Sequence, residues 1–430
     1  MKRFDSSRYV LMVCLVCIAP TMSACSANSS AITPLQDTAS LRAANSGLGP
    51  TGFKLLYSFA SKRENGRKPV GTRLAVVNGL LFGTTTLGGK RDWGTVFTID
   101  PTNDTEDVIY SFKGNRGATD GGGAKGSLRY VNGAIYGTTH SGGIGGGECY
   151  SGNGCGTIFS VSPSGSETVL HSFGGSGDGV FPAGGLVDGG GTFYGTTLYG
   201  GKYGDGIVFS SGPTGNESVV YSFAGPSADG AFPTADLTYK DGMIYGTTEL
   251  GGSGCGTYGC GTVFSIDAAS GKEVVIYSFS GGPDGAYPVS DLVDVKGTLY
   301  GVTAGFAQKH CSKTCGNVFA VTTAGKERVV YSFKGAKDGA EPFGDLLYYY
   351  GNFYGTTNVG GGSGCPLKTT VGCGTVFKLT ASGKETVLHR FNLTDGFMPQ
   401  TNLIEYGGAI YGTTSFGGAD GNGTVFAITP

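Results

Sequence analysis

Short apolar runs separated by glycine-rich turns repeat along the chain from residue 52 to the C-terminus. In one unit these runs lie at residues 235–239, 243–248, 261–266 and 273–279. The last of them contains Val-Val-Ile-Tyr, and such consecutive apolar positions are typical of a strand that is covered on both faces. Each unit is therefore predicted to be a four-stranded sheet packed between two neighbouring sheets.

Three motifs mark the unit, and each occurs seven times. The first, Tyr/Phe-Gly-x-Thr, begins at Phe82, Tyr136, Tyr194, Tyr245, Tyr300, Tyr354 and Tyr411. Gly-x-Val/Ile-Phe follows each copy, and an aromatic residue or His, then Ser or Arg, then Phe closes the unit. Four strands per repeat at spacings of 51 to 58 residues are typical of a propeller blade. The predicted fold is all-β, a seven-bladed β-propeller of four-stranded blades.

The order of the motifs at the two ends predicts how the ring closes. The repeat region begins with the last strand of a unit, residues 53–59, and ends with the third, residues 423–428. The N-terminal strand is therefore expected to join the last blade as its outer edge, which closes the ring. The glycine of Tyr-Gly-Thr-Thr would weaken an isolated strand, so its recurrence predicts that it lets adjacent sheets approach closely.

The residues before the repeats are interpreted as an export signal followed by a flexible tether. Residues 1–24 have a basic start and an apolar run too short to span a bilayer, as in a signal peptide. Met22-Ser23-Ala24-Cys25 resembles a lipobox, which predicts a lipid on Cys25 and a lipoprotein of the outer membrane or cell surface. Cleavage after Ala27 would instead release a secreted or periplasmic protein. Residues 25–51 are rich in Ser, Ala, Thr and Asn and are expected to form a flexible tether.

The repeat itself resembles a known family. Leu-Tyr-Gly-Thr-Thr, Gly-Gly, Gly-Thr-Val-Phe, Leu/Val-Tyr-Ser-Phe and Asp-Gly-x-x-Pro together are similar to the GloVer (Gloeo/Verruco) tandem-repeat family over residues 52–430. The resemblance implies a repeat propeller that is exported and carries one of several kinds of surface anchor, and it implies no particular reaction. Two copies depart from the pattern: Val302 replaces Thr, and Asp120 is followed by Gly-Gly-Gly-Ala without Pro.

Composition and charge narrow the possible partners. The 82 Gly and 16 Pro approach the content of low-complexity chains, but 39% hydrophobic residues, with 23 Tyr and 25 Phe, can build a folded core. The 30 basic and 32 acidic residues leave a net charge of −2, which provides no field for nucleic acid. We therefore expect no nucleic-acid partner, contact with a membrane only through the lipid anchor, and a monomer.

Eight of the 11 cysteines lie in pairs within the loop that precedes Gly-x-Val/Ile-Phe. The pairs are Cys149/Cys155, Cys255/Cys260, Cys311/Cys315 and Cys365/Cys373. Their even number, local spacing and exported context predict four disulfides, each closing one loop. The alternative is a zinc site, because His310 adjoins Cys311, but the other pairs bring no His and structural zinc usually has four ligands. No metal and no cofactor are predicted.

An aspartate precedes Gly-x-x-Pro in most repeats and is a candidate for the ligand-binding face. These residues are Asp178, Asp229, Asp284, Asp338 and Asp395, with Asn65 in the first copy. One interpretation places their carboxylates around the channel mouth, where they bind cations or sugar hydroxyls. The alternative is an Asx turn, in which the carboxylate accepts backbone N–H groups. Repetition in nearly every blade favours the turn.

Loop residues that differ between repeats are further candidates on the same face. The first blade carries Arg91, Asp92 and the single Trp of the chain, Trp93, where other blades have cysteines. An exposed Trp beside charged groups can stack on a sugar ring, and the alternative is an aromatic that covers its own blade. Equivalent loops carry Tyr150, Tyr199, Tyr203 and Tyr258.

Local motifs for catalysis are absent. The sequence has no Gly-x-Ser-x-Gly elbow, His-Glu-x-x-His helix or P-loop, and two of its four His stand where other repeats have Tyr. We therefore name no catalytic residue and expect a binding or scaffold module for an extracellular polymer or envelope protein. The alternatives are a polysaccharide hydrolase or lyase with a site at the channel mouth, and a structural spacer without a small ligand.

Overall fold

The computed structural model describes residues 52–430 apart from several short segments. The segments outside the described residues are 63, 72, 115–119, 145–148, 150–152, 227–228, 306–314, 336, 363–364 and 366–371. The predicted signal peptide, Cys25 and the tether also lie outside them, as do Tyr150, Cys311 and His310. No helix in the described part of the chain is long and apolar enough to cross a bilayer.

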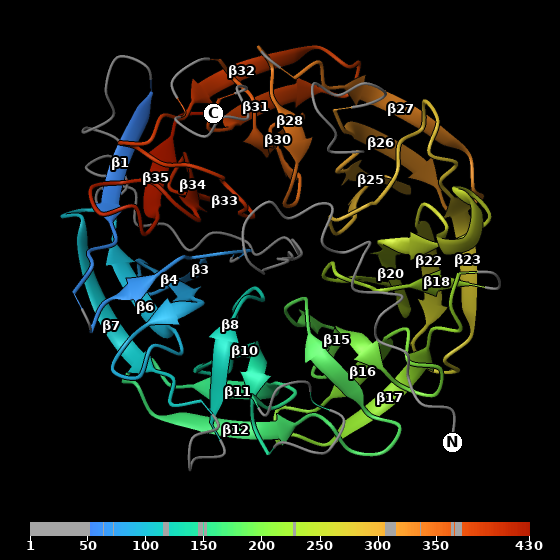
Figure 1. The fold of residues 1–430 in the computed structure, drawn as a ribbon, viewed down its shortest axis with the longest axis horizontal. Coiled ribbons are helices and arrows are strands. Elements are labelled where there is room, and N and C mark those ends of the chain that lie inside the picture. The colour runs from blue at the N-terminus through green and yellow to red at the C-terminus, as the bar shows by residue number, and fades with distance from the viewer. Residues whose placement is uncertain are drawn as a thin grey trace.

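Seven antiparallel sheets stand around a central axis and form a propeller (Figure 1). The prediction of a seven-bladed, all-β propeller is confirmed. Blades I to VII are numbered along the chain, and strands run from the axis outward in the order given. Blade I contains β3 (Ala75–Val77), β4 (Leu80–Thr85), β6 (Thr95–Asp100) and β7 (Thr105–Ser111), with β2 (Gly66–Arg67) paired to β5 (Leu87–Gly88).

In the next three blades the inner strand is split into two short pieces. Blade II contains β8 (Gly121–Ala124) and β9 (Arg129–Val131), then β10 (Ala134–Gly142), β11 (Thr157–Val161) and β12 (Glu167–Ser172). Blade III contains β13 (Gly179–Pro182) and β14 (Val187–Asp188), then β15 (Phe193–Gly200), β16 (Ile207–Ser211) and β17 (Glu217–Ser222). Blade IV contains β18 (Gly230–Ala231) and β19 (Thr238–Lys240), then β20 (Met243–Thr248), β21 (Leu250–Gly251), β22 (Thr262–Asp267) and β23 (Glu273–Ser278), with a 3₁₀ turn η2 (Gly256–Tyr258).

The remaining blades complete the ring. Blade V contains β24 (Val293–Val295), β25 (Thr298–Thr303), β26 (Asn317–Thr322) and β27 (Glu327–Ser332). Blade VI contains β28 (Ala340–Pro342) and β29 (Leu347–Tyr349), then β30 (Asn352–Val359), β31 (Thr375–Thr380) and β32 (Glu385–Arg390). Blade VII contains β33 (Ile404–Tyr406), β34 (Ala409–Thr414), β35 (Thr424–Ile428) and, as its outer strand, β1 (Phe53–Ser58).

The N-terminal strand closes the ring as predicted. β1 pairs antiparallel with β35, from Phe53 opposite Ile428 to Ser58 opposite Thr424 (Figure 1). Phe59, which follows β1, is fully buried and lies edge-on against Phe97 of blade I, with ring centroids 5.1 Å apart. The strand therefore joins blade VII by hydrogen bonds and blade I by packing.

An aromatic pair of the same geometry joins every two neighbouring blades. The Phe after each outer strand meets the Phe of the third strand of the next blade, with centroids 5.0 to 5.2 Å apart. The pairs are Phe59–Phe97, Phe112–Phe159, Phe173–Phe209, Phe223–Phe264, Phe279–Phe319, Phe333–Phe377 and Phe391–Phe426. Edge-to-face pairs of buried aromatic rings stabilise such a core beyond the area they bury.

The glycine of Tyr-Gly-Thr-Thr makes room for these rings. A Cβ on Gly246 would lie 2.5 Å from Cζ of Phe264, its partner on the neighbouring strand of the same blade. The sequence had suggested that this glycine admits the adjacent sheet, and the structure corrects that detail. It admits a ring of its own blade, and that ring then contacts Phe223 of the preceding blade.

The connections divide between two faces of the disc. The cysteine-bearing loops and the links between blades share one face, which we call the loop face: the amide of Tyr287, in a link, donates to the carbonyl of Cys260 (2.9 Å). The short turns share the opposite face, which we call the turn face: the amide of Ala268 donates to the carbonyl of Gly242 (2.9 Å). The long, variable connections are therefore all presented on the loop face.

Candidate functional site

Two positions along the innermost segment of each blade differ from blade to blade, although the surrounding motifs recur. The rim position stands immediately before Pro, or before Ala124 in blade II, and is occupied by Lys68, Gly123, Phe181, Phe232, Tyr287, Glu341 and Met398. The axial position lies four or five residues later, immediately before a leucine, and is occupied by Arg73, Ser127, Gly185, Asp236, Asp291, Asp345 and Asn402. Side chains that vary on a rigid repeated scaffold are candidates for binding a ligand.

The rim residues share an unusual backbone conformation. The six that are not glycine have φ between 52° and 61°, and Gly123 of blade II has φ 63°. Bulky residues rarely adopt this left-handed region. The loop of the preceding blade holds each in place: the amide of Phe181 donates to the carbonyl of Cys155 (2.8 Å) and that of Glu341 to Cys315 (2.7 Å). Such enforced strain clusters at functional sites.

The rim side chains are a mixed set of aromatic, charged and apolar groups. Phe232 (3% exposed) and Tyr287 (9%) are buried, whereas Lys68, Phe181, Glu341 and Met398 are partly exposed. Phe181 is stacked on His140 at 4.9 Å, and Phe232 lies edge-on to Tyr199 at 5.1 Å. Lys68 places its ammonium 4.8 Å from the ring centre of Phe416. This combination of apolar rings and polar groups suits the apolar faces and hydroxyls of sugars.

The axial residues link neighbouring inner strands across the centre of the ring. Asp345 accepts the backbone N–H of Asp291 (3.0 Å), and Asn402 accepts that of Asp345 (2.9 Å). Asp236 accepts the N–H of Gly185 in the same way. These side chains are only 1–3% exposed. The axial residues therefore form a belt of side-chain hydrogen bonds, whose main role is to hold the innermost segments of neighbouring blades together.

The axial residues and their neighbours concentrate ionisable groups in a buried interior. Burial and the neighbouring Asp345 raise the pKa of Asp236 to about 8. The same two causes raise the pKa of Asp291 well above its usual range. Burial, with the nearby Arg73, lowers the pKa of Arg129. Such perturbed groups are candidates for acid–base chemistry, but their burial closes them to a bulky substrate.

The repeated aspartates of the loop face lie at the outer strands. Asp229 accepts the hydroxyl of Tyr221 (2.7 Å) and the backbone N–H groups of Ala224 (3.1 Å) and Gly230 (2.5 Å). Tyr221 belongs to the outermost strand of its blade, so this carboxylate does not border the channel mouth. The corresponding bonds recur at Asp178, Asp284, Asp338 and Asp395 and hold the link between blades in its turn.

A glutamate that sequence reasoning missed completes each of five blade junctions. The outer strand of the next blade begins with Glu167, Glu217, Glu273, Glu327 or Glu385, and burial raises the pKa of each to about 7. The aspartate of the same junction adds to every one of these shifts. The signal was present in the sequence as a Glu eight or nine residues after the Phe of the Gly-x-Val/Ile-Phe motif in the first six blades.

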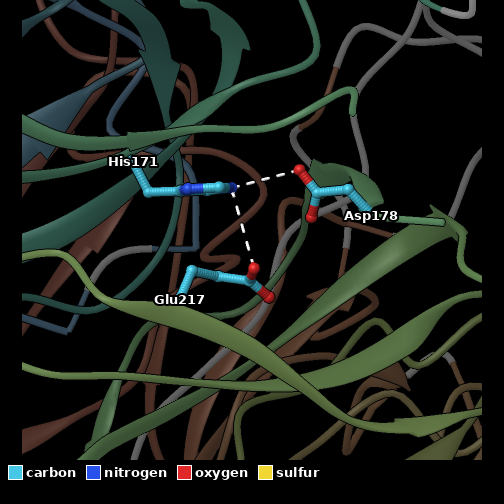
Figure 2. Close-up of side chains that lie close together, drawn as sticks. All are labelled: His171, Asp178 and Glu217. Carbon is cyan, nitrogen blue, oxygen red and sulfur yellow. Dashed lines mark hydrogen bonds and ion pairs between the residues drawn. The ribbon is translucent and has the colours of Figure 1, made fainter. Parts of the chain in front are cut away.

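The junction of blades II and III differs because His171 replaces the usual tyrosine. Its Nε2 lies 3.1 Å from Oδ2 of Asp178 and 4.0 Å from Oε2 of Glu217 (Figure 2). Among the described residues these three form the one group of His, Cys, Asp and Glu close enough to hold a metal, with ligand atoms within 4.8 Å of one another. The imidazole comes from β12, the first carboxylate from the link and the second from β17.

Of the candidates in the first blade's loop, Trp93 packs between blades I and II. A Cβ on Gly122 of blade II would lie 2.3 Å from the ring of Trp93, so the indole rests directly on that backbone. Asp92 forms an ion pair with Arg67 (2.5 Å) and accepts the N–H of Gly88 (2.7 Å). Arg91 is exposed. Trp93 therefore packs against the protein and does not project freely into solvent.

The tyrosine candidates do not gather in one place. Tyr199 is wedged between Phe181 (6.2 Å) and Phe232 (5.1 Å) and so belongs to the rim. Tyr203 is 48% exposed and lies under the ammonium of Lys202 (4.9 Å). Tyr258 ends the 3₁₀ turn of blade IV and is half-buried.

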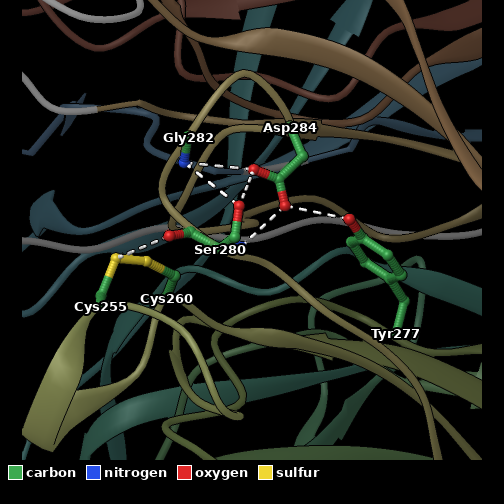
Figure 3. Close-up of a disulfide and its surroundings, with 6 residues drawn as sticks. All are labelled: Cys255, Cys260, Tyr277, Ser280, Gly282 and Asp284. Atoms are coloured by element: carbon green, nitrogen blue, oxygen red, sulfur yellow. Dashed lines mark hydrogen bonds between the residues drawn. A yellow bond between two sulfur atoms is a disulfide. The ribbon is translucent and has the colours of Figure 1, made fainter.

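Three of the predicted disulfides are present among the described residues. They are Cys149–Cys155, Cys255–Cys260 and Cys365–Cys373. Cys315 is also disulfide-bonded, and Cys311 lies outside the described residues. In blade IV, Cys255 lies 3.9 Å from the carbonyl oxygen of Ser280, whose amide donates to Asp284 (2.7 Å) (Figure 3). The disulfide therefore closes its loop against the aspartate turn of the same blade.

The repeat pattern is also recognised by comparison with known families. The profile of the Gloeobacter/Verrucomicrobia repeat matches residues 46–258 and 240–426, which together span most of the chain. The protein belongs to this repeat family. A comparison of the sequence with curated proteins finds no match.

One solved structure supports the propeller architecture of this Gloeobacter/Verrucomicrobia repeat protein, and two others show a weaker likeness. An oligogalacturonate lyase in complex with manganese is similar over 88% of this chain and 96% of its own, with 12% identity and a TM-score of 0.52. The oligogalacturonate lyase of Vibrio parahaemolyticus covers 89% and 93%, with 11% identity and a TM-score of 0.49. A putative 6-phosphogluconolactonase from Bacteroides uniformis covers 77% and 88%, with 13% identity and a TM-score of 0.48. At these identities the similarity concerns the fold alone.

Proposed function

We propose that this repeat protein is an exported binding module that holds an extracellular polymer, in the first place a polysaccharide, at the rim of its loop face. The observation that carries the proposal is the ring of left-handed, blade-specific rim residues. A backbone position that would suit glycine is occupied by Lys, Phe, Tyr, Glu and Met in six blades. Residues in a strained backbone conformation cluster at sites where the side chain has a functional role, such as binding a ligand.

Location and anchoring follow from the same proposal. Disulfides persist in oxidising compartments, so the closed loops support an exported protein. A lipid on Cys25, carried by a tether over residues 25–51, would hold the propeller at an envelope surface with its loops available to a polymer.

A polysaccharide hydrolase or lyase is the second candidate, and the axial carboxyls favour it. Asp236, with a pKa raised to about 8, stands near Asp345, as an acid–base pair would require. Their exposure of 1–3% opposes it, because a glycosidic bond must reach the catalytic carboxyls. The rim is therefore the stronger site.

The test measures retention and chemistry together. The purified protein is incubated with a panel of polysaccharides and envelope extracts, and both retained protein and product masses are recorded. We expect retention by a polysaccharide without any change of mass. Phe181→Gly removes a rim side chain but keeps the backbone, because blade II has Gly123 at this position, and we expect at least about a tenfold loss of affinity, equivalent to about 1.4 kcal/mol.

A matched control lies on the turn face. Tyr350 is 83% exposed and also has positive φ (45°), so Tyr350→Gly removes an exposed aromatic from an equally strained position. This variant should bind as the unchanged protein does. Equal retention of the Phe181→Gly variant would contradict a binding site at the rim, and new product masses would establish the enzyme.

A further inference from the structure

The junction of blades II and III has the composition of a metal site, and its six counterparts do not. Five other junctions have a tyrosine at the position of His171, namely Tyr57, Tyr110, Tyr221, Tyr277 and Tyr331. A tyrosine hydroxyl is not a usual ligand for a divalent ion. The second histidine of this kind, His389, contacts Asp395 (3.2 Å), but its ring is stacked on Phe53 at 3.6 Å where other junctions have Glu. Among the junctions that the structure describes, one nitrogen and two carboxylate donors therefore meet only at His171.

The spacing of the three donor atoms suits a small divalent ion. Ligands bound at about 2.0–2.2 Å stand roughly 3 to 3.5 Å from one another. Nε2 of His171 lies 3.1 Å from Asp178 Oδ2 and 4.0 Å from Glu217 Oε2 (Figure 2). A small rotation of the glutamate side chain would bring all three atoms onto one ion.

An unpaired buried oxygen provides a second, independent indication. Oε1 of Glu217 is shielded from solvent and has no hydrogen-bond partner among the described residues. A buried carboxylate oxygen without a partner is costly, and a cation would satisfy it. The other junction glutamates share this feature, but none of them faces an imidazole.

The surroundings hold the central ligand in place. Asp178 accepts the backbone N–H of Gly174 through Oδ2 (3.1 Å) and that of Gly179 through Oδ1 (2.7 Å). Gly174 in turn packs on the Cys149–Cys155 disulfide, because a Cβ there would lie 2.8 Å from the sulfur of Cys155. Hydrogen bonds to a ligating carboxylate fix its orientation and raise metal affinity.

We propose that His171, Asp178 and Glu217 bind a divalent transition-metal ion, with Zn²⁺ preferred, which fastens the outer strand of blade II to that of blade III. An imidazole ligand selects zinc-like ions over Ca²⁺ and Mg²⁺, which prefer sites made of oxygen alone. Three protein ligands leave at least one coordination position for water.

The test is a calorimetric titration of the full, disulfide-intact chain with ZnCl₂ at pH 7.5 after treatment with a chelator. We expect one equivalent to bind. His171→Tyr introduces the residue found at five other junctions, so it should fold, and it should weaken binding by at least about tenfold, or about 1.4 kcal/mol. Glu217→Gln should also weaken binding and provides a second variant with a different ligand removed.

His389→Tyr is the matched control, because it removes a histidine from the same strand position where no glutamate is present. It should bind zinc as the unchanged protein does. Bound Co²⁺ should show the visible absorption of a site with nitrogen and oxygen ligands, and Ca²⁺ should not compete.

Lowering the pH to 5.5 should weaken zinc binding, because protons compete with the metal ion for its ligand atoms. Absence of binding, equal binding by His171→Tyr, or equal loss in His389→Tyr would each overturn the proposal. The result is independent of polysaccharide retention, so failure of either proposal leaves the other standing.

Discussion

At the scale of the residue, the most consequential interactions are electrostatic and couple two carboxyl groups at each junction between neighbouring blades. Each of five junctions brings one aspartate and one glutamate together in a half-buried site, and the tyrosine or histidine stands beside them. The aspartate receives several hydrogen bonds, whereas one glutamate oxygen receives none. The glutamate therefore takes up the proton, because burial penalises its charged form.

These glutamates predict that the propeller is more stable in mild acid. Their pKa is about 7 in the folded protein, above the value of 4.5 usual for the unfolded chain. The stabilisation is complete below pH 4.5 and is lost as the pH rises through 7. We expect the melting temperature to fall between pH 5 and pH 8, measured by thermal unfolding.

A single substitution isolates the effect. Glu273→Gln removes the charge and should raise the melting temperature at pH 8 by about 2 °C, with little change at pH 5. Glu64→Gln, at an exposed position, is the control. The buried His140 opposes the trend, because its pKa lies well below 6.5 and the unfolded chain gains a proton there as the pH falls. A stability that rises toward pH 8 would contradict the assignment.

At the scale of the element, strand pairing is adapted to the aromatic ring of the neighbouring strand. In blade IV, the glycine at position 246 leaves its strand without a side chain, and the ring of Phe264 occupies the space. That ring can then meet Phe223 of blade III edge-on at 5.1 Å. A residue that weakens a strand locally thus allows the packing between blades.

Gly246→Ala should destabilise the propeller by about 1–3 kcal/mol, because the new methyl group would overlap the ring of Phe264. Gly212→Ala is the control, since its nearest neighbouring atom would lie 3.9 Å from the added Cβ and no positive φ is involved. Chemical denaturation of both variants gives the comparison. Equal stability of the two would contradict the packing role of this glycine.

At the scale of the whole molecule, the ring depends on one strand from the far end of the chain. β1 supplies the outer edge of blade VII, and the residue that follows it, Phe59, supplies the aromatic contact with blade I. Without them the third strand of blade VII becomes an exposed edge and the ring is open.

Deletion of residues 52–59 should therefore lower the melting temperature by about 10 °C or more, or abolish a single cooperative transition. Phe59→Ala, which keeps the hydrogen bonds of β1 but removes the fully buried ring, should cost about 3–5 kcal/mol. Differential scanning calorimetry distinguishes the two. Unchanged unfolding of the deletion variant would show that closure does not support the ring.

Sequence alone determined the fold, because the same pattern of apolar runs and turn residues occurs seven times along the chain. The apolar runs, the turn residues and the strand order at the two ends were sufficient for the blades and for the closure by β1. Cysteine spacing was sufficient for the three disulfides whose cysteines both lie among the described residues. In each case the partners lie within one repeat or at corresponding places of adjacent repeats.

Tertiary structure decided where chemistry could occur, because that depends on side chains about 50 residues apart. His171 and Glu217 come from different blades and Asp178 from the link between them, and their meeting follows from the curvature of the ring rather than from any motif. The left-handed backbone of the rim likewise reflects a hydrogen bond from the preceding blade that overrides the preference of Phe181 or Glu341. Local propensity yields to such contacts when the closed ring enforces them.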